Sequence, residues 1–328
     1  MKKLTAILLA LLLAAALPLA LASCADDGKY TIGIVQLVTH DALDAATNGF
    51  MQAVKDELGE ENVTFDLQNA GGDAAMCKTI TDNFASKGVD LIMANATPAL
   101  QAAVKSTTGI PILGTSVTEY GVALEIENFS GTVGGNVSGT SDLAPLTEQA
   151  KMITDLVPNA TKVGLLYCAA EANSVYQVNV IKEELAKKNI TCTAYTFADT
   201  NDVSTVAAKA ASENDAIYVP TDNTAASCAA AIYAAMGENK KPIIAGEEGI
   251  CKGCGIATLS ISYSDLGYAT GKMAAKILKG ESKIAEMPIE YAPQTTKKYN
   301  AQICKALGMD TAALEAAGYS VIEGTQAQ

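Results

Sequence analysis

The sequence contains no arginine, no tryptophan and a single histidine, His40. Without arginine, no site in this protein can hold a phosphate or carboxylate through the bidentate guanidinium fork. A single histidine also excludes a metal site built from several histidines. Acidic residues outnumber basic ones by 36 to 23, which gives a formal net charge of −13. An acidic chain without a basic block is not typical of a nucleic-acid-binding protein.

Cysteine is sparse as well. Eight cysteines in 328 residues are too few for a disulfide scaffold. The chain does have a hydrophobic share of 49% with only 18% charged residues, which is typical of a globular rather than a disordered protein. Its length allows two domains at roughly 150 residues each.

The first residues have the composition of an export signal. Two lysines precede an apolar run over residues 4–22, which ends in the segment Leu21-Ala22-Ser23-Cys24. A basic start, an apolar core and small residues before a cleavage site indicate a secretory signal, and this ending resembles that of a bacterial lipoprotein. The resemblance implies a signal peptide over 1–23, a lipid on Cys24, a tether over 24–30 and an extracytoplasmic protein that is lipid-anchored to the cell membrane. An uncleaved membrane-spanning anchor is the alternative, because the run is nearly long enough to span a bilayer.

From Tyr30 onwards, short β-rich runs alternate with helical stretches. Strands are predicted at 31–37, 63–67, 90–93 and 110–113, and again at 162–167, 190–197, 216–219, 242–245 and 256–262, with helices between most of them. This alternation predicts right-handed βαβ units and parallel sheets. The chain is therefore expected to be an α/β protein with two parallel-sheet lobes. In such sheets, ligands bind beyond the carboxyl ends of the strands.

Polar residues at the predicted strand ends and helix starts could line a cleft between these lobes. The candidates are His40, Asn69, Thr97 and Thr118 from the first lobe, and Ser141, Asp142, Asn173, Ser174, Asp222, Asn223 and Glu248 from the second. Several stand where a helix begins, and the unpaired N–H groups there suit a carboxylate. Thr, Ser and Asp also cap helices in any α/β protein, so a purely capping role is the competing interpretation.

An ordered series of short motifs makes the chain resemble one family. The motifs are Ile32-Gly33-Ile34-Val35-Gln36, His40, Gly49-Phe50, Gln68-Asn69-Ala70, Gly72-Asp73, Ala96-Thr97-Pro98, Val117-Thr118, the segment Gly135 to Asp142, Asn173-Ser174-Val175, the segment Tyr218 to Thr224, Glu248-Gly249 and Leu266-Gly267. Each motif alone is weak. The series covers most of residues 31–290 and resembles the ABC transporter substrate-binding lipoproteins of the tryptophan/tyrosine (TrpX-like) type.

The resemblance implies a type I periplasmic-binding-protein fold, with two Rossmann-like lobes joined by a hinge of three crossings. Lobe 1 is expected at 31–118 plus 255–285, and lobe 2 at 119–254 plus 286–323. The implied function is capture of a small solute in the interlobe cleft by hinge closure, and delivery to an ABC permease and its ATPase. Similar proteins bind aromatic amino acids, so an aromatic amino acid is the first expectation for the ligand. The resemblance implies no enzyme activity and no metal or other cofactor.

The residue types suggest roles for an amino acid ligand. Without arginine, a ligand carboxylate must be held by hydroxyl and backbone N–H groups or by lysine. We expect the Thr97 and Ser174 hydroxyls to hold it. Asp222 is expected to accept the ligand's ammonium, with Glu248 as a second candidate, because a buried ammonium needs a charged acceptor. Three tyrosines near the predicted lips of the cleft could stack on an aromatic ring, namely Tyr120, Tyr176 and Tyr263.

The segment Cys251-Lys252-Gly253-Cys254 departs from the family pattern. A C-x-x-C pair can be a redox pair, half a metal site or a local disulfide. The segment is expected in a turn between strands, and no second such pair occurs. A structural disulfide or two idle thiols is the preferred interpretation. The alternatives to a transport function are a redox protein that uses this pair, and a ligand-sensing lobe of a membrane receptor.

Overall fold

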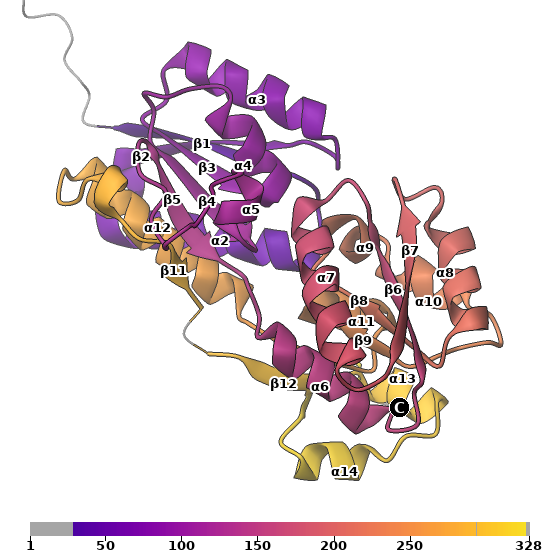
Figure 1. The fold of residues 1–328 in the computed structure, drawn as a ribbon. Coiled ribbons are helices and arrows are strands. Elements are labelled where there is room, and N and C mark those ends of the chain that lie inside the picture. Colours follow the sequence, from indigo (N-terminus) through magenta and orange to yellow (C-terminus); the bar gives the residue numbers. More distant parts are fainter. Residues whose placement is uncertain (1–28, 293, 326–328) are drawn as a thin grey trace, which may run out of the picture.

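The computed structural model describes residues 29–292 and 294–325. They form two lobes, each a mostly parallel sheet flanked by helices (Figure 1). The predicted α/β architecture is confirmed. The expected signal peptide over 1–23 and the lipidated Cys24 lie outside the described residues. Within the described ranges, no helix is long and apolar enough to cross a membrane.

Lobe 1 is built on a six-stranded sheet in which all neighbouring strands run parallel. In spatial order the strands are β11 (Glu290–Tyr291), β5 (Val137–Ser141), β4 (Ile112–Val117), β3 (Leu91–Asn95), β1 (Tyr30–Gln36) and β2 (Val63–Asn69). The helices are α2 (Asp41–Leu58), α3 (Ala74–Lys87), α4 (Thr97–Val104), α5 (Tyr120–Ala123) and α12 (Tyr263–Leu278), with the 3-10 turns η2 (Glu60–Asn62) and η3 (Ile284–Glu286). Apolar clusters on both faces of the sheet explain why its central strands are apolar runs rather than alternating ones.

Lobe 2 is built on a seven-stranded sheet, and only the pairing of β10 with β12 is antiparallel. In spatial order the strands are β13 (Ser320–Val321), β12 (Thr296–Tyr299), β10 (Ala257–Ser260), β9 (Ile243–Ala245), β8 (Ala216–Val219), β6 (Lys162–Cys168) and β7 (Thr191–Phe197). The helices are α6 (Leu146–Leu156), α7 (Ala172–Ala186), α8 (Val203–Glu213), α9 (Asn223–Ser227), α10 (Ala229–Ala235), α11 (Glu248–Cys254), α13 (Ala301–Ala306) and α14 (Thr311–Ala316). Two further apolar clusters form its core.

The chain passes between the two sheets after β5, after β10 and after β11. These crossings differ from the expected lobe boundaries. Residues 137–141 were expected in lobe 2, but β5 pairs with β4 of lobe 1. Residues 257–260 were expected in lobe 1, but β10 pairs with β9 of lobe 2. Residues 290–291 were expected in lobe 2, but β11 pairs with β5 of lobe 1. The reason is that strand pairing, and not position along the chain, decides to which lobe a strand belongs.

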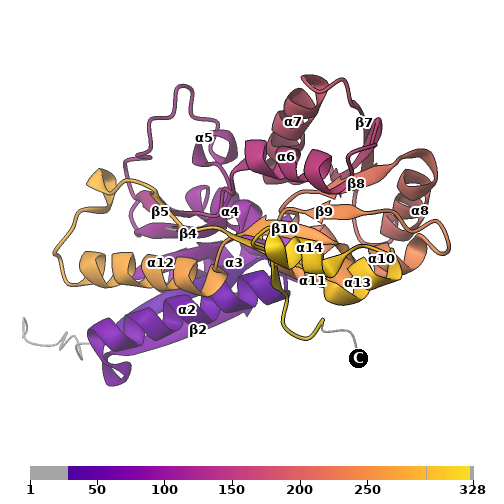
Figure 2. The ribbon, with the colours of Figure 1, turned by 90° about the horizontal axis from the view of Figure 1, so that it is seen from below.

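Helices α2 and α12 pack side by side on one face of the lobe 1 sheet (Figure 2). A Cβ atom added at Gly267 would overlap the carbonyl oxygen of Ala46, and one at Gly49 would overlap the carbonyl oxygen of Ser264. Glycine at these positions therefore lets the two backbones approach. Helix α2 begins just after His40, and α12 begins at the second crossing. The contact between α2 and α12 therefore fixes the positions of His40 and of the second crossing relative to each other.

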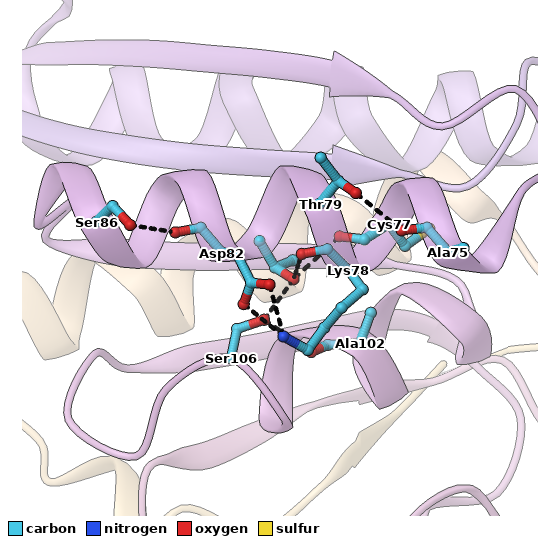
Figure 3. Close-up of polar contacts among 9 residues, drawn as sticks. Ala75, Cys77, Lys78, Thr79, Asp82, Ser86, Ala102 and Ser106 are labelled. Carbon is cyan, nitrogen blue, oxygen red and sulfur yellow. Dashed lines mark hydrogen bonds and ion pairs between the residues drawn. The ribbon is translucent and has the colours of Figure 1, made fainter.

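Helix α3 shows how local sequence signals set an element. The Asp73 side chain caps its first turn by accepting a hydrogen bond from the Ala75 N–H at 2.7 Å, and Gly88 ends it with a φ of 67°. Figure 3 shows polar contacts on one face of α3, where the hydroxyl of Ser106, just beyond α4, lies 2.7 Å from the hydroxyl of Thr81. Lys78 and Asp82 form an exposed ion pair there, 2.5 Å between Nζ and Oδ1. Such a pair contributes little, so the apolar packing beneath it holds this face.

Candidate functional site

A small enclosed cavity lies between the lobes. Its lining residues come from helix starts and strand ends of both lobes and from the crossings: His40, Leu43, Ser116, Thr118, Asp142, Asn173, Thr221, Asp222, Asn223, Ala226, Glu247 and Tyr263. Its free volume is about 10 Å³, which is the space of about one water molecule. A larger ligand therefore enters only when the lobes separate. The cavity lies where ligands bind in open α/β sheets, beyond the carboxyl ends of the strands.

The lobe 1 side of this region has strained backbone and unpaired hydroxyls. Ser116, near the end of β4, has a φ of 54°, and Ala96, which precedes α4, has a φ of 96°. Such conformations are costly for residues other than glycine and cluster at binding sites. The buried hydroxyls of Ser116 and Thr97 have no hydrogen-bond partner among the described residues. The structure therefore keeps polar groups free here at a cost in stability.

On the lobe 2 side, Glu171 organises the start of α9. Its carboxylate is buried and accepts hydrogen bonds from the backbone N–H and the side-chain amide of Asn223, at 3.0 and 2.7 Å. It also accepts bonds from the N–H and hydroxyl of Thr224, both at 2.8 Å. The Asn223 amide nitrogen is thereby turned towards Glu171. Its oxygen lies 3.3 Å from Nε2 of His40 in lobe 1.

Two of the three carboxylates that line the cavity are already occupied as helix caps. Asp222 accepts hydrogen bonds from the N–H groups of Ala225 at 2.8 Å and Cys168 at 2.7 Å, one on each oxygen. Burial and the neighbouring Glu171 raise the pKa of Asp222. Glu247 accepts bonds from the first N–H groups of α11, and burial raises its pKa to about 7.

The third carboxylate, Asp142, is different. It follows β5 at the first crossing and is only 3% exposed. Its Oδ2 accepts a hydrogen bond of 2.9 Å from the hydroxyl of Tyr263, which belongs to the second crossing. Its Oδ1 has no hydrogen-bond partner among the described residues. Burial raises the pKa of Asp142, although the hydroxyls of Thr118 and Tyr263 lower it in part. A buried carboxyl group with a free oxygen is costly unless a ligand completes its bonds.

The structure brings six of the predicted residues together around the cavity. These are His40, Thr118, Asp142, Asn173, Asp222 and Asn223. The other five do not line it. Thr97 and Ser174 are buried beside helix starts, and Ser141 donates to the Thr118 carbonyl at 2.7 Å. Asn69 is exposed and bonds to Thr39, and Glu248 forms an ion pair with Lys298 at 2.5 Å.

Among the tyrosines, only Tyr263 lines the cavity. The Tyr120 ring is buried in the lobe 1 core, where its hydroxyl donates to the Thr140 carbonyl at 3.1 Å. Tyr176 packs against the lobe 2 core. Sequence reasoning missed Ser116, Glu171 and Glu247. The sequence contains a weak signal for Glu247, because an acidic residue directly before a helix often caps it. Choosing Glu247 over Glu248 required knowing that α11 begins at Glu248.

The sequence model for ABC transporter substrate binding proteins matches residues 31–315. The chain belongs to this family. The tyrosine-binding protein of Clostridioides difficile (strain R20291) is 36% identical over 283 residues, which are 85% of this chain and 81% of the relative. A Streptococcus pneumoniae ABC domain in complex with L-Trp is 32% identical and superposes with a TM-score of 0.84, covering 90% of this chain and 100% of that one. The family and the type I periplasmic-binding fold inferred from the motifs are confirmed.

The lobes of this ABC substrate-binding protein are arranged more as in the L-Trp complex than as in an open relative. A Clostridium difficile substrate-binding protein with adhesive properties, in its ligand-free, open structure, is 37% identical and covers 89% of this chain and 99% of its own. Despite the higher identity, its TM-score is 0.67, against 0.84 for the L-Trp complex. The contact of His40 with Asn223 and an ion pair of Asp41 with Lys252, at 3.3 Å, connect the two lobes directly.

The C-x-x-C segment of this substrate-binding protein lies on a helix. The expectation of a turn is wrong, because the Glu247 carboxylate caps the segment and starts α11. Cys251 and Cys254 are fully buried and free. Burial raises the pKa of both thiols, which disfavours the reactive thiolate. Lys252, between them, is exposed and forms the ion pair with Asp41. The two thiols thus belong to the apolar core of lobe 2.

Proposed function

We propose that this protein is the extracytoplasmic, lipid-anchored receptor of an ABC importer for an aromatic amino acid. The observation that carries the proposal is the enclosed cavity between the lobes, because four of its lining residues have buried polar atoms without a partner in the described residues. They are His40, Ser116, Asp142 and Asn173. Such atoms are destabilising unless a ligand completes their hydrogen bonds. The ligands of the two relatives, tyrosine and L-Trp, supply the class.

The transport step requires no bond making by this protein. A ligand that contacts both lobes stabilises the closed form by its higher affinity for that form. The permease and its ATPase would then receive the ligand from the closed receptor. Of the other functions considered, a redox role finds no support in the two buried thiols of α11.

A binding experiment tests the ligand class. The purified mature protein, freed of copurified ligand, is titrated with L-tryptophan, and the selectively excited indole emission is followed. Because the protein has no tryptophan, this emission reports the ligand alone. We expect saturable binding with competition by tyrosine or phenylalanine. Stabilisation against unfolding should reach about 2.7 kcal/mol at a ligand concentration of 100 Kd.

L-Glutamate and myo-inositol serve as control ligands and should have no effect. If no aromatic amino acid stabilises the protein or competes, the proposed ligand class is wrong. The lipid anchor has a separate test. Cells grown with a labelled fatty acid should label the wild-type protein and not Cys24→Ser, and equal labelling of the two would contradict the anchor.

A further inference from the structure

Three of the unpaired atoms around the cavity are acceptors rather than donors. Asp142 contributes Oδ1, Asn173 contributes Oδ1 and His40 contributes Nδ1, and none has a partner among the described residues. Asp142 belongs to a crossing, Asn173 to lobe 2 and His40 to lobe 1. All three residues line the same cavity of about 10 Å³.

The hydrogen-bond network fixes His40 and Asn173 as acceptors. The Asn223 amide nitrogen donates to Glu171, so its oxygen lies towards His40, and Nε2 of His40 must donate to it. In the neutral imidazole, Nδ1 is then the acceptor. Burial lowers the pKa of His40, which favours this neutral form.

Asn173 is fixed in the same way. Its amide nitrogen donates to the Thr221 carbonyl at 3.0 Å and to the Glu171 carboxylate at 3.1 Å. The amide oxygen is therefore the group left free. Both neutral acceptors owe their orientation to Glu171, which binds Asn223 and Asn173 together.

The charge of the cavity selects between the two ends of an amino acid. Its lining residues include three carboxyl groups, Asp142, Asp222 and Glu247, and no lysine. A ligand carboxylate placed against the free acceptors would be repelled by their lone pairs. An ammonium group carries three donors and a positive charge, so it can satisfy three acceptors at once. Of the three carboxyl groups, only Asp142 retains an unpaired oxygen.

We infer that the ligand's ammonium group is received jointly by His40 Nδ1, Asp142 Oδ1 and Asn173 Oδ1, and that it is the group that draws the lobes together. This inference rests on the proposed binding function and assigns the ammonium to Asp142 rather than to Asp222. A compound that lacks a cationic nitrogen leaves all three acceptors unpaired in the closed form. Such a compound does not close the receptor.

Ligand analogues test the inference on the wild-type protein. Binding of L-tyrosine, tyramine and 3-(4-hydroxyphenyl)propionate is measured by calorimetry, because the two analogues each lack one charged end of tyrosine. We expect the propionate to bind at least about 100-fold more weakly than tyrosine. Affinity typically falls by this much when a buried charge loses its partner. Tyramine should retain more affinity than the propionate. A propionate that binds as tightly as tyrosine would overturn the inference.

Asp142→Asn tests the charged acceptor, since the substitution keeps the size of the side chain. We expect the selectivity for tyrosine over the propionate to fall from about 100-fold or more to less than about fivefold. A merely structural role would not change this ratio. Asp44→Asn is the matched control, because Asp44 is near His40 on α2 but does not line the cavity. It should keep the wild-type ratio, and a ratio unchanged in Asp142→Asn would contradict the assignment.

The outcomes separate this inference from the proposed function. If tyrosine and tryptophan bind but the propionate binds equally well, the ammonium assignment fails and the aromatic amino acid function stands. If another amino acid or amine binds and no aromatic amino acid does, the proposed ligand fails and the ammonium assignment stands. If only compounds without a cationic nitrogen bind, or if no amino acid or amine binds, both fail.

Discussion

Single residues around the cavity differ in how many of their hydrogen bonds are already made. Asp222, which the sequence suggested as the ammonium acceptor, has both oxygens bonded to backbone N–H groups. Asp142 has one oxygen free. Both are buried acids close to a strand end, and the sequence does not distinguish them. The difference follows from the position of Asp222 directly before α9, where its side chain caps the helix.

Asp222→Ala is therefore expected to act mainly on stability. The substitution removes the cap of α9 and the partner of the buried Cys168 N–H, and we expect the free energy of unfolding to fall by about 2–3 kcal/mol. Urea unfolding followed by circular dichroism measures it. Asp202→Ala is the control, because Asp202 precedes α8 but makes no side-chain capping bond. It should change stability by less than about 0.5 kcal/mol. Equal losses in the two variants would contradict the capping role.

The pH dependence of binding should depend on His40. In the closed form, burial holds its pKa below the ordinary value of 6.5, and opening exposes the ring and returns the pKa towards that value. As the pH falls below 6.5, the open form therefore takes up a proton first. Affinity for tyrosine is full above pH 6.5 and is lost as the pH falls towards the lowered pKa of the closed form.

Calorimetry at several pH values between about 7.5 and 5.5 measures the loss of tyrosine affinity in the wild type and in His40→Gln. The acidic groups that face this part of the molecule are Asp41 and Asp44 on α2, Asp142 at the first crossing, and Glu171, Asp222 and Glu247 from lobe 2. They remain in His40→Gln, so any pH dependence that they cause remains too. We expect a smaller slope of log Kd against pH in the variant. An unchanged slope would show that His40 does not titrate with closure.

The site was predictable in part because strand ends can be located from the sequence. His40 follows the apolar run that became β1, and Asn173 and Asn223 stand at helix starts. Asp142 follows β5, whose sequence Val-Ser-Gly-Thr-Ser is not an apolar run and was not among the predicted strands. Glu171 was not predictable, because its five bonds join two segments about fifty residues apart along the chain. Which buried atoms stay unpaired also depends on the tertiary structure.

Individual helices and strands were predicted better than which of them lie side by side in the fold. The apolar run of β1 and the capped start of α3 identify these elements from local sequence. The assignment of β5 and β10 to lobes failed, because local sequence does not encode which strands pair. The α2–α12 contact is also tertiary, yet it depends on single glycines in the sequence.

Gly267→Ala is expected to disrupt this helix pair. The added methyl group would overlap the Ala46 carbonyl, so α12 must shift, and we expect a loss of about 1–3 kcal/mol in the free energy of unfolding. Thermal unfolding measures the change. Gly109→Ala is the matched control, because an added Cβ there has no neighbour within 4 Å. A loss no greater than in the control would show that the helices can separate without cost.

At the scale of the whole molecule, few polar contacts between described residues connect the two lobes outside the crossings. The ion pair of Asp41 with Lys252 is exposed, with side-chain exposures of 70% and 49%. Exposed pairs contribute about 0–1 kcal/mol. The cavity, by contrast, contains several buried polar groups that have no partner among the described residues. Closure should therefore depend on the ligand rather than on the surface ion pair.

Lys252→Ala separates these two contributions. Because an exposed pair is weak, we expect tyrosine affinity to change by less than about fivefold. We expect addition of tyrosine to lower the radius of gyration in X-ray scattering as much as in the wild type. Lys279→Ala is the matched control, since Lys279 pairs with Glu57 within lobe 1. If Lys252→Ala abolishes the ligand-induced compaction and Lys279→Ala does not, the surface ion pair drives closure. The buried acceptors would then only select the ligand.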